Sequence, residues 1–277
     1  MQDKLRKKLM VLLAAVFVIG IFLMANQRIQ YRQADQVQNK AEQLVMQKPS
    51  RETTAKPVTP KQPEILELPE EQIPLISQPE PDDQARQMMT MDIAALQAVN
   101  GDVFGWITIP DTKINYPLLE ADTAEEYLHT AWDGSSIYSG SIYLESKNAR
   151  DFSDFHSIIY GHNMANGTMF GNLILYKTQE FAESHPYVYV LSGNTVRRYH
   201  IFAAYNAPVE SDTYYINFES AARRETAIAY YLSQNVLKAP VIPTGNDRIL
   251  TLSTCTGTGN YAQRWVVQAV LDVTWTF

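Results

Sequence analysis

The sequence holds a single cysteine, Cys255, among 277 residues. One cysteine excludes an intrachain disulfide framework and a cysteine-rich zinc site, because both need at least two thiols. Positive charge is also scarce. The formal net charge is −7, and the chain beyond residue 25, without the four basic groups and one acid that precede it, carries −10. A body this acidic lacks the positive surface that nucleic-acid binding requires, so we expect no nucleic-acid partner.

Long apolar runs are limited to one, residues 9–25, which follows four basic side chains within residues 1–8. As a helix this run would be about 26 Å long, just enough to cross the hydrocarbon core of a bilayer. The basic flank predicts a cytoplasmic N-terminus and an extracellular body. A cleaved signal peptide is the alternative, but residues 23–27 match a cleavage site poorly. We therefore expect a single-pass anchor in the cell membrane.

The next stretch has little of what a packed domain needs. Eight of the 14 prolines lie between residues 49 and 81. Helix and sheet interiors exclude proline at that density, so an extended, semi-rigid spacer is predicted. Apolar residues at three- and four-residue steps between residues 34 and 44 predict a short helix that continues from the membrane. We expect residues 26–83 to form a stalk and residues 84–277 the globular domain.

The globular part consists mainly of short apolar or alternating runs separated by turn signals. Helical spacing is confined to residues 84–99, 123–130 and 218–237. Many short strands with few helices indicate a closed or nearly closed β-barrel. The eight expected strands cover residues 104–109, 114–119, 141–145, 157–160, 187–191, 196–205, 248–252 and 264–271.

Cys255 lies where the strand at 248–252 ends, and Arg264 begins the next strand after a turn-rich stretch at 256–260. Two strands joined in this way form an antiparallel hairpin, in which the end of the first faces the start of the second. Cys255 and Arg264 are therefore expected side by side. A neighbouring cation favours the thiolate, which is the nucleophile. The alternative is that a lone cysteine is a small buried apolar residue.

His162 is the histidine with a pattern that points to chemistry. It follows the expected strand at 157–160 and sits in a Gly-His-Asn turn, as Cys255 follows its own strand. The other four histidines have no such context. A thiol, an imidazole and a guanidinium together suit acyl transfer: the thiolate attacks a carbonyl, the imidazolium protonates the leaving amine, and the guanidinium binds the oxyanion.

These residues resemble those of the sortases, the cysteine transpeptidases of Gram-positive cell surfaces. Thr-Leu-Ser-Thr-Cys, ending at Cys255, resembles the family's Thr-Leu-x-Thr-Cys signature, and Arg264 falls where the family's arginine is expected. Residues 161–171 around His162 resemble the histidine region of class B sortases. Other parts of class B sortases are resembled by the segments 104–110 and 114–117 and by the helix at 218–237. The resemblance covers about residues 92–277.

The resemblance implies an eight-stranded sortase β-barrel with a few peripheral helices. It implies that His162, Cys255 and Arg264 are catalytic and that Ser253 and Leu128 line the substrate groove. It also implies cleavage of a C-terminal sorting motif in secreted proteins through a thioester on Cys255. No cofactor is implied. Because no acidic cluster resembles a calcium site, we expect no metal.

The acceptor of the acyl group stays open between two amines. In the family it is an amine of a peptidoglycan precursor or, in pilus-building members, a pilin lysine. The residue after the cysteine is Thr256, which resembles pilin-polymerising relatives. Class B enzymes often have an acidic residue at this position. The non-enzymatic alternative is a membrane-tethered barrel that only binds a wall polymer or a partner protein.

Overall fold

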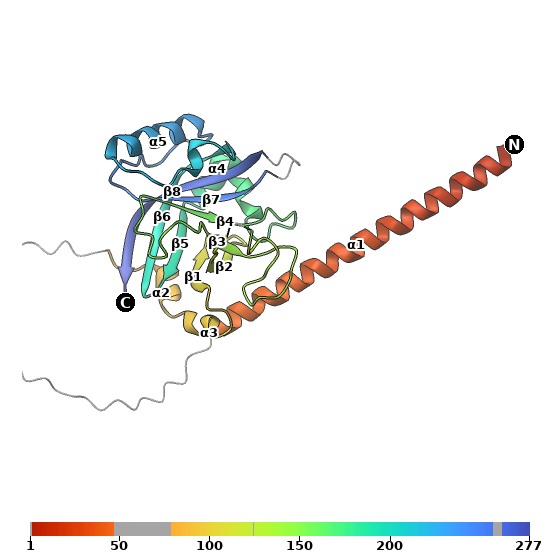
Figure 1. Ribbon diagram of the computed structural model, residues 1–277, viewed down its shortest axis with the longest axis horizontal. Coiled ribbons are helices and arrows are strands. Elements are labelled where there is room, and N and C mark those ends of the chain that lie inside the picture. Colours follow the sequence, from red (N-terminus) through yellow and green to blue (C-terminus); the bar gives the residue numbers. More distant parts are fainter. Residues whose placement is uncertain (1, 47–78, 124, 257–261) are drawn as a thin grey trace, which may run out of the picture.

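The computed structural model describes residues 2–46, 79–123, 125–256 and 262–277 (Figure 1). Within these residues eight strands close into a barrel in the order β1-β2-β3-β4-β7-β8-β6-β5, which confirms the predicted fold. The strands are β1 (Val103–Thr108), β2 (Asn115–Glu120), β3 (Ile142–Leu144), β4 (His156–Tyr160), β5 (Tyr187–Ser192), β6 (Thr195–Pro208), β7 (Ile249–Cys255) and β8 (Gln263–Thr276).

Helices lie outside the barrel. They are α1 (Gln2–Met46), α2 (Asp83–Met89), α3 (Ile93–Gln97), α4 (Gln179–Ser184) and α5 (Ala221–Gln234), with short 3-10 segments η1 (Gly171–Lys177) and η2 (Asp212–Tyr214). The helix expected at 84–99 is interrupted, because Asp92 accepts a hydrogen bond from Ala95 N at 3.2 Å and so caps a new helix, α3.

The helix expected at 123–130 is not formed by the residues described there, so that prediction was wrong. Backbone carbonyls of this segment, which a helix would use for its own hydrogen bonds, accept from residues 137–141 instead. Tyr127 O accepts from Ser141 N at 3.0 Å, and His129 O accepts from Ile137 N at 2.9 Å. The segment is therefore held open as turns against residues 137–141.

Three buried clusters explain why both faces of several strands are apolar. The first takes residues from every strand, such as Ile107, Leu250 and Val267, and fills the barrel. The second, which includes Trp106 and Leu119, lies under the N-terminal helices, and the third lies under α5. Burial on both faces fixes the register of each strand, because a slip of one residue would exchange inside for outside.

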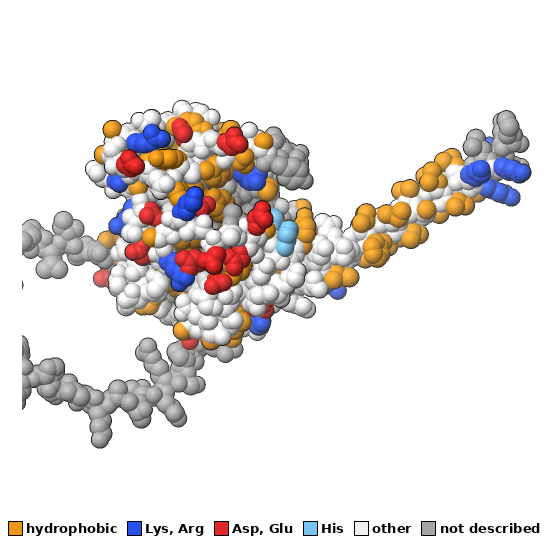
Figure 2. Space-filling model, in the orientation of Figure 1, with side chains coloured by type: hydrophobic (Ala, Val, Ile, Leu, Met, Phe, Trp, Pro, Cys, Tyr) orange, Lys and Arg blue, Asp and Glu red, His pale blue; other side chains and the backbone are white. Residues whose placement is uncertain are grey.

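The helix α1 runs for 45 residues, and its N-terminal part projects away from the barrel (Figure 1). Figure 2 shows hydrophobic side chains over this projecting part and Lys and Arg side chains near its N-terminal end. It is the one helix among the described residues that is long and apolar enough to cross a membrane. This is compatible with the predicted anchor at residues 9–25.

The C-terminal turns of α1 pack on the barrel, which the stalk prediction did not anticipate. Ala41 and Val45 are 0% and 1% exposed within the second cluster. Trp132 Nε1 donates to Val37 O at 2.9 Å, and Lys40 Nζ pairs with Asp133 at 2.8 Å. The apolar stripe on this part of the helix is therefore part of the core of the globular domain.

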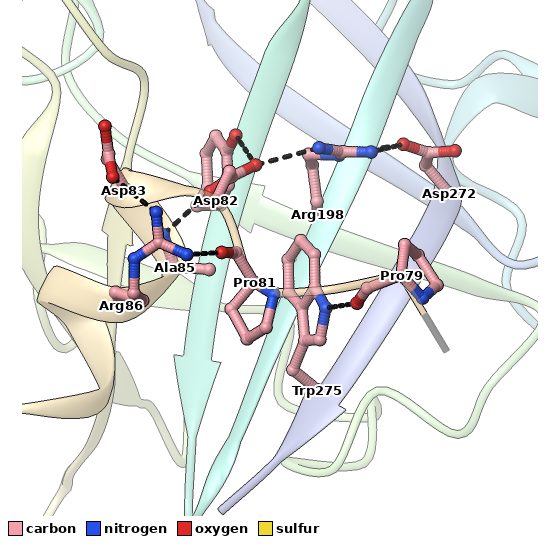
Figure 3. Close-up of polar contacts among 10 residues, drawn as sticks. Pro79, Pro81, Asp82, Asp83, Ala85, Arg86, Arg198, Asp272 and Trp275 are labelled. Carbon is pink, nitrogen blue, oxygen red and sulfur yellow. Dashed lines mark hydrogen bonds and ion pairs between the residues drawn. The ribbon is translucent and has the colours of Figure 1, made fainter. Parts of the chain in front are cut away.

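Both flanks of the proline-rich segment lie on the barrel. At one flank Val45 O accepts from Asp92 N at 2.9 Å. At the other, Pro79 O accepts from Trp275 Nε1 at 2.6 Å (Figure 3). The extended conformation expected for residues 47–78 lies outside the described residues. The described residues on either side of it, Val45 and Pro79, are both held on the globular domain.

Arg198 joins the start of α2 to the sheet through two ion pairs. It pairs with Asp82 at 2.8 Å and with Asp272 of β8 at 2.7 Å, so it joins the start of α2 to the sheet (Figure 3). Asp82 also accepts from Ala85 N at 2.9 Å and so caps α2. These contacts and the Pro79–Trp275 bond together hold the start of α2 on the sheet.

Candidate active site

The three predicted catalytic residues lie at one end of three adjacent strands, β4, β7 and β8, with His162 in the loop that follows β4. β4 and β7 are parallel neighbours with Tyr160 opposite Ser253. His162 and Cys255 each stand two residues further along, so the equal offset brings them to the same end of the sheet. Neighbouring strands are about 4.8 Å apart. On the other side of β7, Cys255 pairs with Arg264 of β8, which confirms the predicted hairpin register.

Polar contacts lock the histidine loop to the cysteine strand. Thr254 Oγ1 donates to Gly161 O at 2.7 Å, and Gly161 N donates to Ser253 O at 3.2 Å. Asn163 Nδ2 donates to Cys255 O at 2.9 Å. Sequence analysis did not identify Asn163, although its place directly after the histidine was a usable signal. These bonds carry the parallel pairing of β4 and β7 past the ends of the strands.

The ring of His162 is oriented by the backbone carbonyl of Leu128. The two atoms, His162 Nε2 and Leu128 O, are 2.8 Å apart. Because a carbonyl can only accept, Nε2 carries a proton, and Nδ1 is the nitrogen that can take up or release a second one. Burial lowers the pKa of His162, the bond to Leu128 opposes this, and the charge of His129 lowers it further.

Two rings that were not predicted from the sequence lie beside the imidazole of His162. The ring centroids of His129 and Tyr138 lie 5.7 and 6.3 Å from that of His162, with interplanar angles of 22° and 18°. Tyr138 is 58% exposed, so this stack forms an outer wall beside the imidazole. It limits the orientations of the ring that the Leu128 carbonyl already holds.

A cleft of about 440 Å³ contains all three residues and extends down the outer face of β3, β4 and β7. Its size is that of a ligand site. Leu128 lines it beside His162. Ser253 also lines it, although it is only 2% exposed, and its hydroxyl lies 2.9 Å from that of Tyr214. Tyr160 also lines the cleft, and its hydroxyl donates to Glu145 at 3.0 Å.

His156 lies outside this cleft. It is 0% exposed, its Nδ1 donates to Tyr215 O at 2.9 Å, and its Nε2 accepts from Thr251 Oγ1 at 2.7 Å. Burial lowers the pKa of His156 to about 4. Both nitrogens are used within the fold, so this histidine is structural. Among the described residues, no group of three or more His, Cys, Asp or Glu side chains is arranged to hold a metal.

Comparison with known proteins identifies the family of the chain. The sortase domain family model matches residues 107–272. Sortase B of Listeria monocytogenes is 37% identical over 183 residues, which cover 65% of this chain and 74% of the relative.

Two solved structures are also similar. A Staphylococcus aureus sortase B–substrate complex has a TM-score of 0.62 at 28% identity and covers 65% of this chain and 84% of its own. Sortase B from B. anthracis in complex with AAEK1 has a TM-score of 0.65 at 27% identity and covers 88% and 99%. The family match and these relatives place the chain in the sortase family of cysteine transpeptidases, as a class B member.

Proposed function

We propose that this enzyme cleaves a C-terminal sorting motif in secreted proteins and joins the acyl part to an amine of a cell-wall precursor. The observation that carries the proposal is that His162, Cys255 and Arg264 line one cleft at the same end of three hydrogen-bonded strands. The similar S. aureus structure is a substrate complex, which supports a peptide in this cleft.

In the first half-reaction the thiolate of Cys255 attacks the carbonyl carbon of the scissile peptide bond. Arg264 lies beside the developing oxyanion and stabilises its charge. As the C–N bond breaks, the leaving amine takes a proton from His162, and a thioester remains on Cys255. Because Nε2 stays on the Leu128 carbonyl, the transferred proton is the one on Nδ1. The lowered pKa of His162 makes its protonated form a stronger acid for this step.

In the second half-reaction an amine attacks the thioester carbonyl. Its proton passes to Nδ1 of His162, the C–S bond breaks, and the thiolate of Cys255 is restored. Water that attacks in place of the amine yields the hydrolysed peptide. The ratio of transfer to hydrolysis therefore reports how well the acceptor is bound.

The apolar part of α1 is proposed to span the membrane, with residues 1–8 in the cytoplasm and the barrel outside. The basic side chains that precede the apolar run support this orientation. The cleft then lies on the side where secreted substrates and wall precursors are found.

A pilin lysine is the second candidate acceptor, because Thr256 follows the cysteine. The two amines are distinguished by offering both to the thioester in one assay. The alternative of a non-catalytic binding module is disfavoured, because the sortase family consists of transpeptidases.

The proposal is tested with the full chain in detergent, a library of sorting-motif peptides, and mass spectrometry of the thioacyl adduct on Cys255. Cys255→Ala should abolish cleavage, because no other cysteine is present to attack. Its circular dichroism should be unchanged, since the half-buried thiol contributes little packing. Cleavage at the wild-type rate by a folded Cys255→Ala protein would exclude the mechanism.

A further inference from the structure

A second cleft, of about 480 Å³, lies between the docked turns of α1 and the barrel. Its walls are residues 34–42 of α1 on one side and β2 with the loops at 131–141 and 166–169 on the other. Figure 1 shows α1 reaching the barrel near β2. The cleft exists because α1 docks there, and it is separate from the cleft that contains Cys255.

The second cleft is lined by half-buried amides and hydroxyls above an apolar base. Gln38, Asn115, Asn166 and Thr168 stand on its walls, and Tyr116 lies at its base. Amide side chains both donate and accept hydrogen bonds, as does each hydroxyl of a sugar ring. Such a lining suits a hydroxyl-rich ligand better than a hydrocarbon one.

Acceptors exceed donors in this cleft. Glu42 Oε1 accepts from Asn115 Nδ2 at 3.0 Å and from Gln38 at 3.2 Å. Within the described part of the chain, Glu42 Oε2 and the carboxylate of Asp35 have no hydrogen-bond partner. The one ammonium of the lining, Lys113 Nζ, already donates to the carbonyl of Asn166 at 2.7 Å. Two carboxylates against one engaged cation disfavour a phosphate and favour a ligand that donates hydrogen bonds.

The second cleft lies back to back with the catalytic histidine. Gly140 lines it, and a Cβ on Gly140 would overlap the carbonyl oxygen of Leu128. That oxygen is the one that holds His162. One layer of backbone therefore separates a ligand in the second cleft from the imidazole that receives the proton of the attacking amine.

The height of the cleft above the membrane also restricts the ligand. Asp35 follows the end of the apolar run by ten residues, or about 15 Å of helix. The headgroup layer of one leaflet is only about 5–8 Å thick. With the apolar run in the bilayer, the cleft opens in the water just beyond the headgroups, where sugars attached to membrane-linked wall precursors lie.

We propose that the second cleft binds the glycan portion of the amine acceptor. The inference rests on the proposed function, because it needs an acceptor whose sugar and amine belong to one molecule. A sugar held in this cleft keeps the linked amine near the thioester on Cys255 and raises its effective concentration. It would thereby favour transfer over hydrolysis.

The experiment compares two acceptors with the full chain in detergent: triglycine alone, and triglycine joined to the peptide of a soluble muramyl disaccharide-peptide. The quantity measured is kcat/KM for the glycan-bearing acceptor divided by that for triglycine. We expect wild type to prefer the glycan-bearing acceptor about tenfold. Ala34→Trp, which fills the cleft from α1, should bring the ratio close to one.

Gln36→Trp is the matched control, because Gln36 is an exposed α1 residue that does not line the cleft. It should retain the wild-type preference. Asp35→Lys is a second test variant: Asp35 is exposed, so its replacement leaves the fold intact. It should also reduce the ratio. A wild-type ratio of one, or a preference that survives in both Ala34→Trp and Asp35→Lys, would overturn the inference.

Saturation-transfer NMR with the muramyl disaccharide alone provides a readout that needs no catalysis. Signals from the disaccharide with wild type and Gln36→Trp, lost in Ala34→Trp, support the site even if no sorting peptide is cleaved. In that outcome the proposed function fails and the glycan site stands. Equal signals in all three proteins reject the glycan site and leave the transpeptidase proposal unaffected. A membrane-linked precursor assayed in parallel shows whether the lipid-bound form is preferred to the soluble one.

Discussion

At the scale of single residues, Leu128 has a second role beside lining the cleft, because its backbone holds the ring of His162. Its carbonyl selects which nitrogen of His162 is protonated at rest, and hence which one is free for the proposed proton transfer. Gly140 supports that carbonyl from behind, with a φ of 57° that favours glycine. The position of the imidazole thus depends on a residue 22 positions earlier in the chain.

Gly140→Ala should therefore damage catalysis as well as stability. Positive φ costs a non-glycine residue about 1–2 kcal/mol. The new Cβ also overlaps Tyr127 O and Leu128 O, which displaces the acceptor of His162. We expect kcat for peptide cleavage to fall about 10- to 100-fold, the typical effect of a displacement near 1 Å. Gly134→Ala is the control, because Gly134 has φ 82° but open space around it. An equal loss of kcat in both variants would contradict this role of Gly140.

At the scale of elements, the strands could be predicted from the sequence because alternation and turn residues are local signals. The hairpin that pairs Cys255 with Arg264 is a case where such signals were sufficient. The turns near Tyr127 could not be predicted, because the groups that take their carbonyls come from residues 137–141 and from His162. The parallel pairing of β4 with β7 is also non-local. The nearness of His162 and Cys255 was therefore expected only from their matching positions after two strands and from the resemblance.

A buried chain of hydrogen bonds lies beneath β7. Tyr205 donates to Gln268 Oε1 at 3.2 Å. Gln268 Nε2 donates to Thr251 Oγ1 at 3.0 Å, and that hydroxyl donates to His156. The chain links β6, β8, β7 and β4 in order, so it ties together the strands that carry the active site. It requires a neutral His156, since Nε2 must accept.

Stability should consequently fall with acidity. The folded pKa of His156, about 4, lies below its usual 6.5 because of burial. The unfolded state then binds the proton first, so stability is full above pH 6.5 and decreases as the pH falls toward 4. The loss is about 3 kcal/mol. Urea unfolding between pH 7 and pH 4 measures it, with His156→Asn as the comparison. Identical pH slopes in the two proteins would show that other groups dominate.

At the scale of the whole molecule, α1 is both the candidate membrane anchor and part of the barrel's core. Its buried stripe adds to a cluster that also includes Leu96, Trp106 and Trp132. The sequence showed the periodicity of this stripe but not its partner, because the partner surface is assembled from strands and loops distant in the chain.

Ala41→Lys should detach this helix end, since Ala41 is 0% exposed and a charged side chain cannot be buried there unpaired. We expect a loss of about 3 kcal/mol, or a fall in Tm of roughly 6–12 °C for a domain of this size. Gln43→Lys, at an exposed position two residues along, should leave Tm unchanged. Thermal unfolding in detergent micelles measures both. A Tm for Ala41→Lys equal to that of the control would mean that the docking contributes little.

One uninterrupted helix, Gln2–Met46, joins the apolar run to the turns that pack on the barrel. With the apolar run in the membrane as proposed, each residue inserted between that run and Val37 would turn the barrel by about 100° and move it by about 1.5 Å along the helix axis. The direction in which Cys255 faces around that axis would therefore be set by the number of residues in α1. Residues added between Met46 and Pro79 should not change this direction, because Val45 before them and Pro79 after them are both bonded to the globular domain.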